Sequence, residues 1–259
     1  MAEEHKTLRI CCFGDSLSAG YSANGTVFHP YSIALTKKLS RDLSNTQVVA
    51  VDYGMPGDVV SQGAFAQRFE TEGASSPHHP RYQPVIKKNY DWVVLLGGTN
   101  DLALNIPPER IFESLKRVWD SAISKGSKVL ALTVPERSTK SESLDDRQRQ
   151  LNNAILKHKS PNYHAFDLMP KLPYHNLTDR QRRRYWDDGV HLTAAGYDWL
   201  GTLVAEVLGD WVELERNPKS RRAQRTRRYV EEDVDFDEET GDPRELSEGY
   251  VVVRLRDLD

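Results

Sequence analysis

Short runs of apolar residues recur along the first 170 residues, separated by longer stretches in which apolar and polar positions mix. Most of these runs are rich in Val, Leu and Ile, and polar or turn residues bound them. The five runs are Leu8–Phe13, Val48–Asp52, Trp92–Leu96, Val129–Val134 and His164–Leu168. Continuous apolar character, as opposed to alternation, is typical of strands covered on both faces. The pattern therefore predicts five buried strands.

Between these runs, apolar residues return at helical spacing. The stretch Pro107–Lys125 opens with a Pro-Pro pair, which suits a helix start, and repeats apolar residues at Ile111, Leu115 and Val118. The predicted helices are Tyr31–Leu43, Pro107–Lys125, Asp145–His158 and Ala194–Leu208. Strands that alternate with helices imply right-handed crossovers and a parallel sheet. We therefore expect one α/β domain, a three-layer α/β/α sandwich, over residues 6–212.

Two segments fall outside this alternation. Gly73–Val85 is rich in Pro, Ser and His and is expected to form a long loop between the second and third strands. Residues 213–259 form a charged tail, with a basic block over residues 216–228 and an acidic block over residues 231–248. Like-charge blocks are usually solvated. The tail is expected to be either disordered or docked, and it is a candidate contact for a protein partner.

Charge and composition argue against two classes of protein: nucleic-acid binders and disulfide-stabilised proteins. Residues 214–259 hold 10 basic and 13 acidic residues, which leaves 25 of each in the rest of the chain (35 − 10 and 38 − 13). A neutral body is not the electrostatic footprint of a nucleic-acid binder. Cys11 and Cys12 are adjacent, so they cannot form a disulfide framework.

Membrane and export signals are also missing from the printed sequence. No stretch approaches the ~20 apolar residues of a membrane span, and the first ten residues contain no apolar signal region. We expect a cytoplasmic protein. Secretion stays open in case a leader precedes this chain.

The first apolar run ends in Gly14-Asp15-Ser16. In an open parallel sheet, ligands bind beyond the carboxyl ends of the strands, where Ser16 would lie at the start of a helix. A helix N-terminus favours negative charge that develops during a reaction. Ser16 is therefore a candidate nucleophile, although a simple N-cap serine would give the same local sequence.

Two further strand ends carry candidate donors. Gly57 follows the second run in Tyr53-Gly54-Met55-Pro56-Gly57, where its main-chain N–H would face the same edge as Ser16. Asn100 follows the third run in Gly97-Gly98-Thr99-Asn100, and a side-chain amide there can donate to an oxyanion. An ordinary turn at Gly57 and an Asx-turn at Asn100 are the alternative interpretations.

A histidine and two aspartates stand together in Asp187-Asp188-Gly189-Val190-His191, just before a predicted helix. A carboxylate near a histidine can fix its tautomer and stabilise the imidazolium during proton transfer. A single histidine is more often structural. Together, however, these stretches supply a nucleophile, a base with its carboxylate and three oxyanion donors.

The four stretches also resemble the four sequence blocks of the SGNH hydrolases, the GDSL esterase/lipase superfamily. The matching blocks are GDSLSAGY, the Gly57 region, GGTND and DDGVH, and the similarity extends from about Leu8 to Leu208. The opening CFGDSLSAGY and the LTVPE at Leu132–Glu136 are similar to small carbohydrate-esterase-like and lysophospholipase-like members.

This resemblance implies a flavodoxin-like sheet of five parallel strands and a role for each signature residue. Ser16 would be the nucleophile and His191 the base, with Asp188, three residues before the histidine, selected over Asp187. The N–H groups of Ser16 and Gly57 and the side-chain amide of Asn100 would form the oxyanion hole. We expect a serine-dependent carboxylic ester hydrolase that forms an acyl-enzyme, with a preference for short acyl groups such as acetyl.

Several alternatives stay open on sequence alone. The same triad would serve an acyltransferase, a lysophospholipase or a thioesterase, and an interaction protein that presents the charged tail is a further possibility. The expected partner is a small-molecule ester, with no cofactor. Adjacent His78 and His79 lack other ligands at metal spacing, so no metal is expected. The loop after the first strand also lacks the hydroxyl-rich sequence that a flavin phosphate would need.

Overall fold

The five predicted strands form one sheet. The computed structural model describes residues 6–70 and 90–216, so the predicted loop Gly73–Val85 and the tail beyond residue 216 lie outside the described residues. The strand order is β4-β1-β5-β6-β7, and every neighbouring pair is parallel. The strands are β1 (Lys6–Gly14), β4 (Thr46–Gly54), β5 (Trp92–Leu96), β6 (Lys128–Leu132) and β7 (Tyr163–Phe166). The predicted five-stranded parallel sheet is confirmed.

Helices follow the strands in the alternation that the sequence predicts. The larger ones are α2 (Ser32–Asp42), α3 (Gly63–Glu70), α5 (Pro108–Ser124), α6 (Glu142–Lys157), α7 (Asp179–Tyr185) and α8 (Ala194–Arg216). Two short helices, α1 (Ser16–Ala19) and α4 (Thr99–Ala103), begin just after β1 and β5. A small antiparallel hairpin, β2 (Tyr21–Ser22) and β3 (Val27–Phe28), follows α1.

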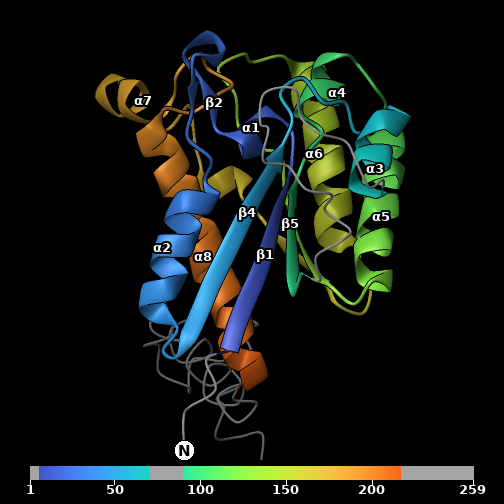
Figure 1. Cartoon of the computed structure of the whole chain (residues 1–259). Coiled ribbons are helices and arrows are strands. Elements are labelled where there is room, and N and C mark those ends of the chain that lie inside the picture. The colour runs from blue at the N-terminus through green and yellow to red at the C-terminus, as the bar shows by residue number, and fades with distance from the viewer. Residues whose placement is uncertain (1–5, 71–89, 217–259) are drawn as a thin grey trace, which may run out of the picture. The chain divides into compact units, whose positions relative to one another are not determined.

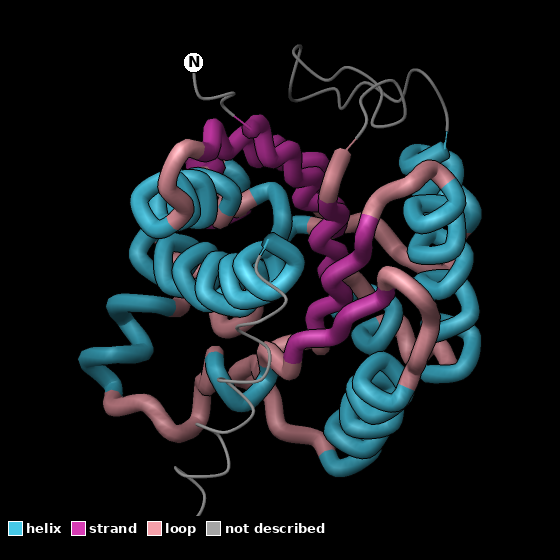
Figure 2. The backbone as a smooth tube through the Cα atoms, turned by 90° about the horizontal axis from the view of Figure 1, so that it is seen from below, coloured by secondary structure: helices cyan, strands magenta, loops and turns pink. Residues whose placement is uncertain are grey.

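The helices cover both faces of the sheet, which gives the predicted three layers. Helices α2 and α8 lie on one face, and α3, α5 and α6 lie on the other (Figures 1 and 2). Side chains alternate along a strand, so neighbouring residues enter different cores. Cys11 and Phe13 of β1 pack in the cluster that holds Phe65 and Trp119 from α3 and α5. Because both faces are buried, the strands read as continuous apolar runs.

The order of the strands indicates where in the sheet a ligand site is expected. Numbered by chain position, the five strands lie in the order 2-1-3-4-5, so the direction of winding reverses between β1 and β5. In such sheets the crevice beyond the carboxyl ends at the reversal point is the preferred ligand site. Ser16 follows β1 and Asn100 lies in α4 after β5, at the upper edge of the sheet in Figure 1.

The sheet and its covering helices belong to a compact unit that ends at Gly209. The last residues of α8 follow that unit along the chain. Within the described ranges, no helix combines the length and the apolar character that crossing a bilayer requires.

Candidate active site

Ser16 begins helix α1 immediately after the tight turn that ends β1. Asp15 is the N-cap residue, and its Oδ1 accepts a hydrogen bond from the Leu17 N–H at 3.0 Å. This local bond satisfies one of the free N–H groups of the first helical turn. Ser16 is buried, with 6% of its surface exposed.

The turn before Ser16 requires glycine. A Cβ on Gly14 would lie 2.1 Å from the Leu96 carbonyl oxygen, a separation that atoms do not tolerate. Without that Cβ, the ends of β1 and β5 come close together, with Gly14 paired to Leu96. The close approach brings the Ser16 turn beside the segment that carries Asn100.

His191 and Asp188 form a turn of their own. Asp188 Oδ2 lies 2.7 Å from His191 Nδ1, while its Oδ1 accepts the N–H groups of Val190 at 3.0 Å and His191 at 2.8 Å. The same carboxylate therefore holds both the backbone and the ring of the histidine. On the other side of the ring, Nε2 lies 2.9 Å from Ser16 Oγ. The structure thus brings the predicted nucleophile, base and acid into one hydrogen-bonded chain.

We name the segment 186–193 the His191 loop. Its ends meet in a bridge between Trp186 and Leu192. Two neighbours then hold it: Asp187 Oδ2 accepts the Ala23 N–H at 2.7 Å, and the Gly189 carbonyl accepts the Ser138 N–H at 2.7 Å. The ring of Tyr21, from the hairpin after α1, lies 4.6 Å from the His191 ring between centroids. These contacts fix where the imidazole meets Ser16.

Gly57, in the loop after β4, and Asn100, in the short helix α4, are the other two predicted oxyanion donors, and both follow strands at the same edge of the sheet. Gly57 has φ of +81°, in the left-handed region that glycine adopts without strain. Asn100 Nδ2 donates to the Asp58 carbonyl at 2.8 Å, which ties its side chain to the residue after Gly57. An amide nitrogen carries two hydrogens, so this bond leaves one of them for a ligand.

Sequence reasoning missed two residues at this edge. Asp101 is fully buried, and its carboxylate accepts the N–H groups of Val60 at 2.9 Å and Ser61 at 2.8 Å. Arg68 of α3 binds Asp58 and two strand-end carbonyls. The GGTND block contains Asp101, so that residue had a readable signal. Nothing in the local sequence marks Arg68.

The environment of Asp188 keeps it charged. Burial favours the neutral form, but hydrogen bonds from the His191 N–H, the His191 ring and the Val190 N–H outweigh it and lower the pKa of Asp188. An ionised carboxylate is the state that orients the imidazole and stabilises its protonated form. Asp188 is therefore expected to remain charged somewhat below the range in which free aspartate titrates.

The pKa of Asp15 shifts in the opposite direction to that of Asp188. Burial raises its pKa to about 7, and the nearby carboxylates Asp58 and Asp101 add to the rise, whereas the Leu17 N–H and Arg68 oppose it. Its Oδ2 has no hydrogen-bond partner among the described residues. The carboxyl group next to Ser16 is therefore a titrating group close to neutral pH.

This raised pKa predicts a pH-dependent stability. The folded protein keeps the Asp15 proton up to about pH 7, whereas the unfolded chain releases it near the ordinary value of 3.8. Between those values the folded state binds more protons, so the free energy of unfolding is expected to fall as pH rises, by at most about 1.4 kcal/mol per pH unit. Above about pH 7 this contribution is lost and the curve levels off.

Urea unfolding of the wild type and of Asp15→Asn across this range measures the effect. Asparagine keeps the acceptor for the Leu17 N–H but cannot ionise, so its curve is expected to lack the Asp15 slope. Asp120→Asn, an exposed change on α5, is the control and should retain the wild-type slope. Parallel curves for wild type and Asp15→Asn would show that Asp15 does not titrate in this range.

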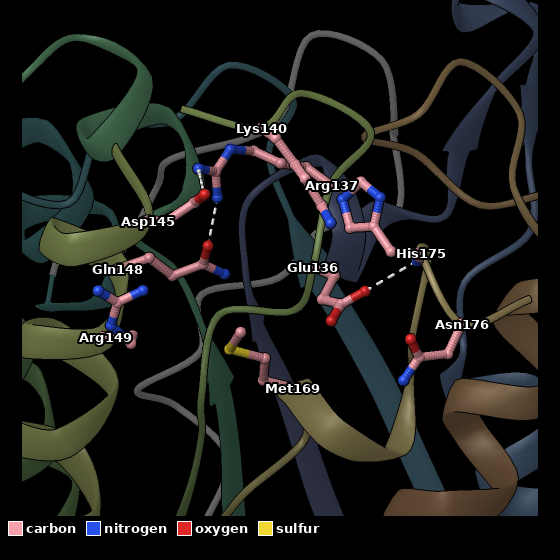
Figure 3. A pocket seen from close by; sticks show the side chains of 9 residues that line it. All are labelled: Glu136, Arg137, Lys140, Asp145, Gln148, Arg149, Met169, His175 and Asn176. Atoms are coloured by element: carbon pink, nitrogen blue, oxygen red, sulfur yellow. Dashed lines mark hydrogen bonds and ion pairs between the residues drawn. The ribbon is translucent and has the colours of Figure 1, made fainter. Parts of the chain in front are cut away.

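A polar cavity of about 230 Å³ lies beyond β6 and β7. Its nine lining residues come from the segment after β6, from α6 and from the segment after β7 (Figure 3). Met169 is the one apolar side chain among them. Glu136 accepts the main-chain N–H groups of Tyr174 and His175 at 2.7 and 3.0 Å, and Arg137 pairs with Asp145 at 2.7 Å.

Metal ligands do not cluster in the parts of the chain that the structure covers: no group of three or more His, Cys, Asp or Glu side chains is placed to hold an ion there. His78 and His79 lie outside the described residues.

Comparison with known proteins adds a family match. The model of the GDSL-like lipase/acylhydrolase family matches residues 12–199, which include all five predicted site residues. Among proteins with curated descriptions, none matches the chain.

Solved structures share the fold at low sequence identity. A lipase/acylhydrolase from Enterococcus faecalis is 22% identical with a TM-score of 0.58, covering 78% of this chain and 96% of that one. A G-D-S-L family lipolytic protein from Veillonella parvula is 21% identical with a TM-score of 0.56, covering 77% and 97%. A catalytic mutant of an acetylxylan esterase from Geobacillus stearothermophilus is 15% identical with a TM-score of 0.58, covering 78% and 93%.

Proposed function

The chain belongs to the GDSL-like lipase/acylhydrolase family and is a carboxylic ester hydrolase, and we propose that it works through an acyl-enzyme formed on Ser16. The observation that carries this proposal is the hydrogen-bonded chain from Ser16 Oγ through His191 to Asp188. A hydroxyl next to a base that is itself oriented by a carboxylate is the arrangement that activates a serine nucleophile.

In the first half of the reaction, His191 Nε2 takes the proton of Ser16 as Oγ attacks the ester carbonyl carbon. The carbonyl oxygen becomes an oxyanion, which the N–H groups of Ser16 and Gly57 and the free amide hydrogen of Asn100 stabilise. Such donors are most effective when they are positioned before the charge develops. The hydrogen bonds of Asp58 and Asp101 to this edge supply that positioning.

The intermediate then collapses, and His191 gives its proton to the departing alcohol. A water molecule, deprotonated by the same imidazole, attacks the acyl carbon to form a second tetrahedral intermediate. When the bond between the acyl carbon and Ser16 Oγ breaks, His191 returns that proton to Oγ, and the acid is released. Asp188 keeps Nδ1 protonated and stabilises the imidazolium in both halves.

For the substrate, we favour a short acyl group on a polar alcohol. Because His191 protonates the leaving alcohol, the alcohol lies on the side of the His191 loop. Ser138, in the segment that also supplies Glu136 and Arg137 to the polar cavity, bonds directly to Gly189 of that loop. A cavity with charged and amide side chains suits hydroxyl groups better than an alkyl chain. The acetylxylan esterase with the same fold acts on esters of this kind, which agrees with the choice of acetyl.

A ladder of p-nitrophenyl esters from acetyl to palmitoyl tests the acyl preference. We expect kcat/KM to be highest for acetyl and to fall at least about tenfold by octanoyl, because the charged and amide side chains that line the cavity beyond β6 and β7 would offer little stabilisation to a long alkyl chain. A maximum at long chains would retain the mechanism and replace the substrate by a lipid.

The alcohol preference needs a separate comparison. Acetylated glucose and hexyl acetate carry the same acyl group, so their relative kcat/KM isolates the alcohol side. The acetylated sugar is expected to be the better substrate. Preference for hexyl acetate would contradict the assignment of the polar cavity to the leaving group.

A further inference from the structure

One guanidinium joins three segments that meet at the candidate active site. Arg68, on α3, donates to the Gly14 carbonyl at 2.9 Å and to the Tyr53 carbonyl at 2.7 Å. These carbonyls belong to the ends of β1 and β4. The same group binds Asp58 Oδ2 through Nη2 at 2.6 Å and Nε at 2.9 Å. Arg68 thus contacts the strand that leads to Ser16 and both sides of the loop that carries Gly57.

Asp58 connects Arg68 to Asn100, the third candidate oxyanion donor. Its carboxylate binds Arg68, and its main-chain carbonyl accepts the side-chain amide of Asn100 at 2.8 Å. Asp58 also directly follows Gly57 in the chain. A displacement of Asp58 would therefore move the Gly57 N–H and release the Asn100 amide at the same time.

Arg68 is held too firmly to be a solvated surface charge. Its side chain is 10% exposed and that of Asp58 is 14% exposed. The guanidinium lies 4.1 Å from the ring centroid of Phe13, which adds a cation–π contact from the buried core. A planar fork that makes four hydrogen bonds in fixed directions is a geometry that lysine cannot reproduce.

The charge of Arg68 also matters at this edge. The buried carboxyl groups of Asp15 and Asp101 lie near Asp58, and each of the three, when ionised, would oppose a new negative charge beside Ser16. Arg68 interacts favourably with both Asp15 and Asp58. Its positive charge therefore offsets a field that would otherwise disfavour the tetrahedral oxyanion.

We propose that Arg68 is a positioning residue of the oxyanion hole, acting through Asp58 to align the N–H of Gly57 and the amide of Asn100 with Ser16. This inference rests on the proposed function, because it assumes that the three donors bind an oxyanion. It assigns a role in transition-state binding to an arginine outside all four sequence blocks.

The test compares binding of a transition-state mimic with binding of the substrate. Phenylboronic acid forms a tetrahedral anionic adduct on a serine nucleophile, so its inhibition constant reports on the oxyanion hole. For Arg68→Met we expect kcat on p-nitrophenyl acetate to fall about 10- to 100-fold, the effect of losing charge-assisted hydrogen bonds, with KM changed less than threefold. The inhibition constant should rise by the same factor as kcat falls.

Two further variants separate positioning from general stability. Arg68→Lys restores the charge without the fork and is expected to recover part of the lost kcat. Leu39→Ala removes a buried side chain of α2, which covers the face of the sheet opposite α3, and should lower the unfolding midpoint while leaving kcat and boronic acid binding unchanged. If Arg68→Met does not fold, Asp58→Asn replaces it, with the same direction of change expected in kcat and in the inhibition constant.

The outcomes distinguish failure of the positioning role of Arg68 from failure of the proposed function. Wild-type boronic acid binding at Ser16, with unchanged binding in a folded Arg68→Met or Asp58→Asn protein, would overturn the positioning role alone. The same loss of boronic acid binding in Leu39→Ala would also overturn it, since stability would then explain the effect. Absence of a wild-type adduct on Ser16, seen by mass spectrometry, would instead overturn the proposed function.

Discussion

Replacing Ser16 by alanine is expected to lower kcat/KM for p-nitrophenyl acetate by about 10⁴-fold or more. The hydroxyl oxygen is the atom that bonds to the acyl carbon in the proposed mechanism, and it lies 2.9 Å from His191 Nε2, the base that activates it. The change removes only one oxygen from a small, buried helix, so the fold should survive. The measurement is the steady-state rate of the purified variant, with its unfolding midpoint as the check on folding.

A double variant tests whether Ser16 and His191 act together as nucleophile and base. Because Ser16 and His191 act as one unit, the Ser16→Ala/His191→Ala protein is expected to be no slower than the slower single variant. Independent roles would instead multiply the two losses. A fluorophosphonate should label Ser16 in the wild type, and slowly or not at all in His191→Ala. Full ester hydrolysis by Ser16→Ala, or labelling at another serine, would contradict the nucleophile assignment.

Asn100→Ala is expected to produce the second largest loss, about 10²- to 10³-fold in kcat with little change in KM. The amide donates to the oxyanion only once the carbonyl becomes tetrahedral, so its removal raises the barrier and leaves ground-state binding intact. Part of the loss will come from the Asp58 carbonyl, which loses its partner at 2.8 Å.

The comparison with Asn100→Asp tests the electrostatic part of this argument. Aspartate has nearly the same shape but places acceptors and negative charge where the oxyanion forms, so it should be slower than the alanine variant. Asn153→Ala, at an exposed position on α6, is the control and should have wild-type kcat. Equal activity of Asn100→Asp and wild type would exclude Asn100 from the oxyanion hole.

The strands were predictable because burial on both faces leaves an unbroken apolar signal. Trp92–Leu96 is predicted and observed with the same bounds, and the other strands differ by a few residues at their ends. Helix α7 was not among the helices predicted from apolar spacing, because none of its residues is buried and it shows no apolar period. A capping box of Thr178 and Gln181 begins it, which is a sequence signal that was available. Helix α3 is short, and only Phe65 and Phe69 mark its buried face.

Some residues of the candidate site could likewise be predicted from local sequence motifs, and others could not. Ser16, Asp188 and His191 lie within a few residues of glycines and polar residues that form recognisable local motifs, so their convergence could be predicted from the sheet edge. The contacts of Arg68 could not be predicted, because they depend on how α3 packs against the ends of β1 and β4. The polar cavity has the same origin, since its walls are distant segments that only the tertiary fold brings together.

The turn that holds His191 has a consequence for how the enzyme would lose activity. Asp188 binds the ring and two N–H groups within four consecutive residues, so base and acid form a small self-contained module. Its link to the nucleophile is a single contact of 2.9 Å across the chain. If the His191 loop swings away, the module moves as a whole and the hydrogen bond between Asp188 and His191 persists, but the imidazole no longer reaches Ser16. Spectroscopic signs of an intact Asp–His pair would therefore persist in a protein that has already stopped turning over.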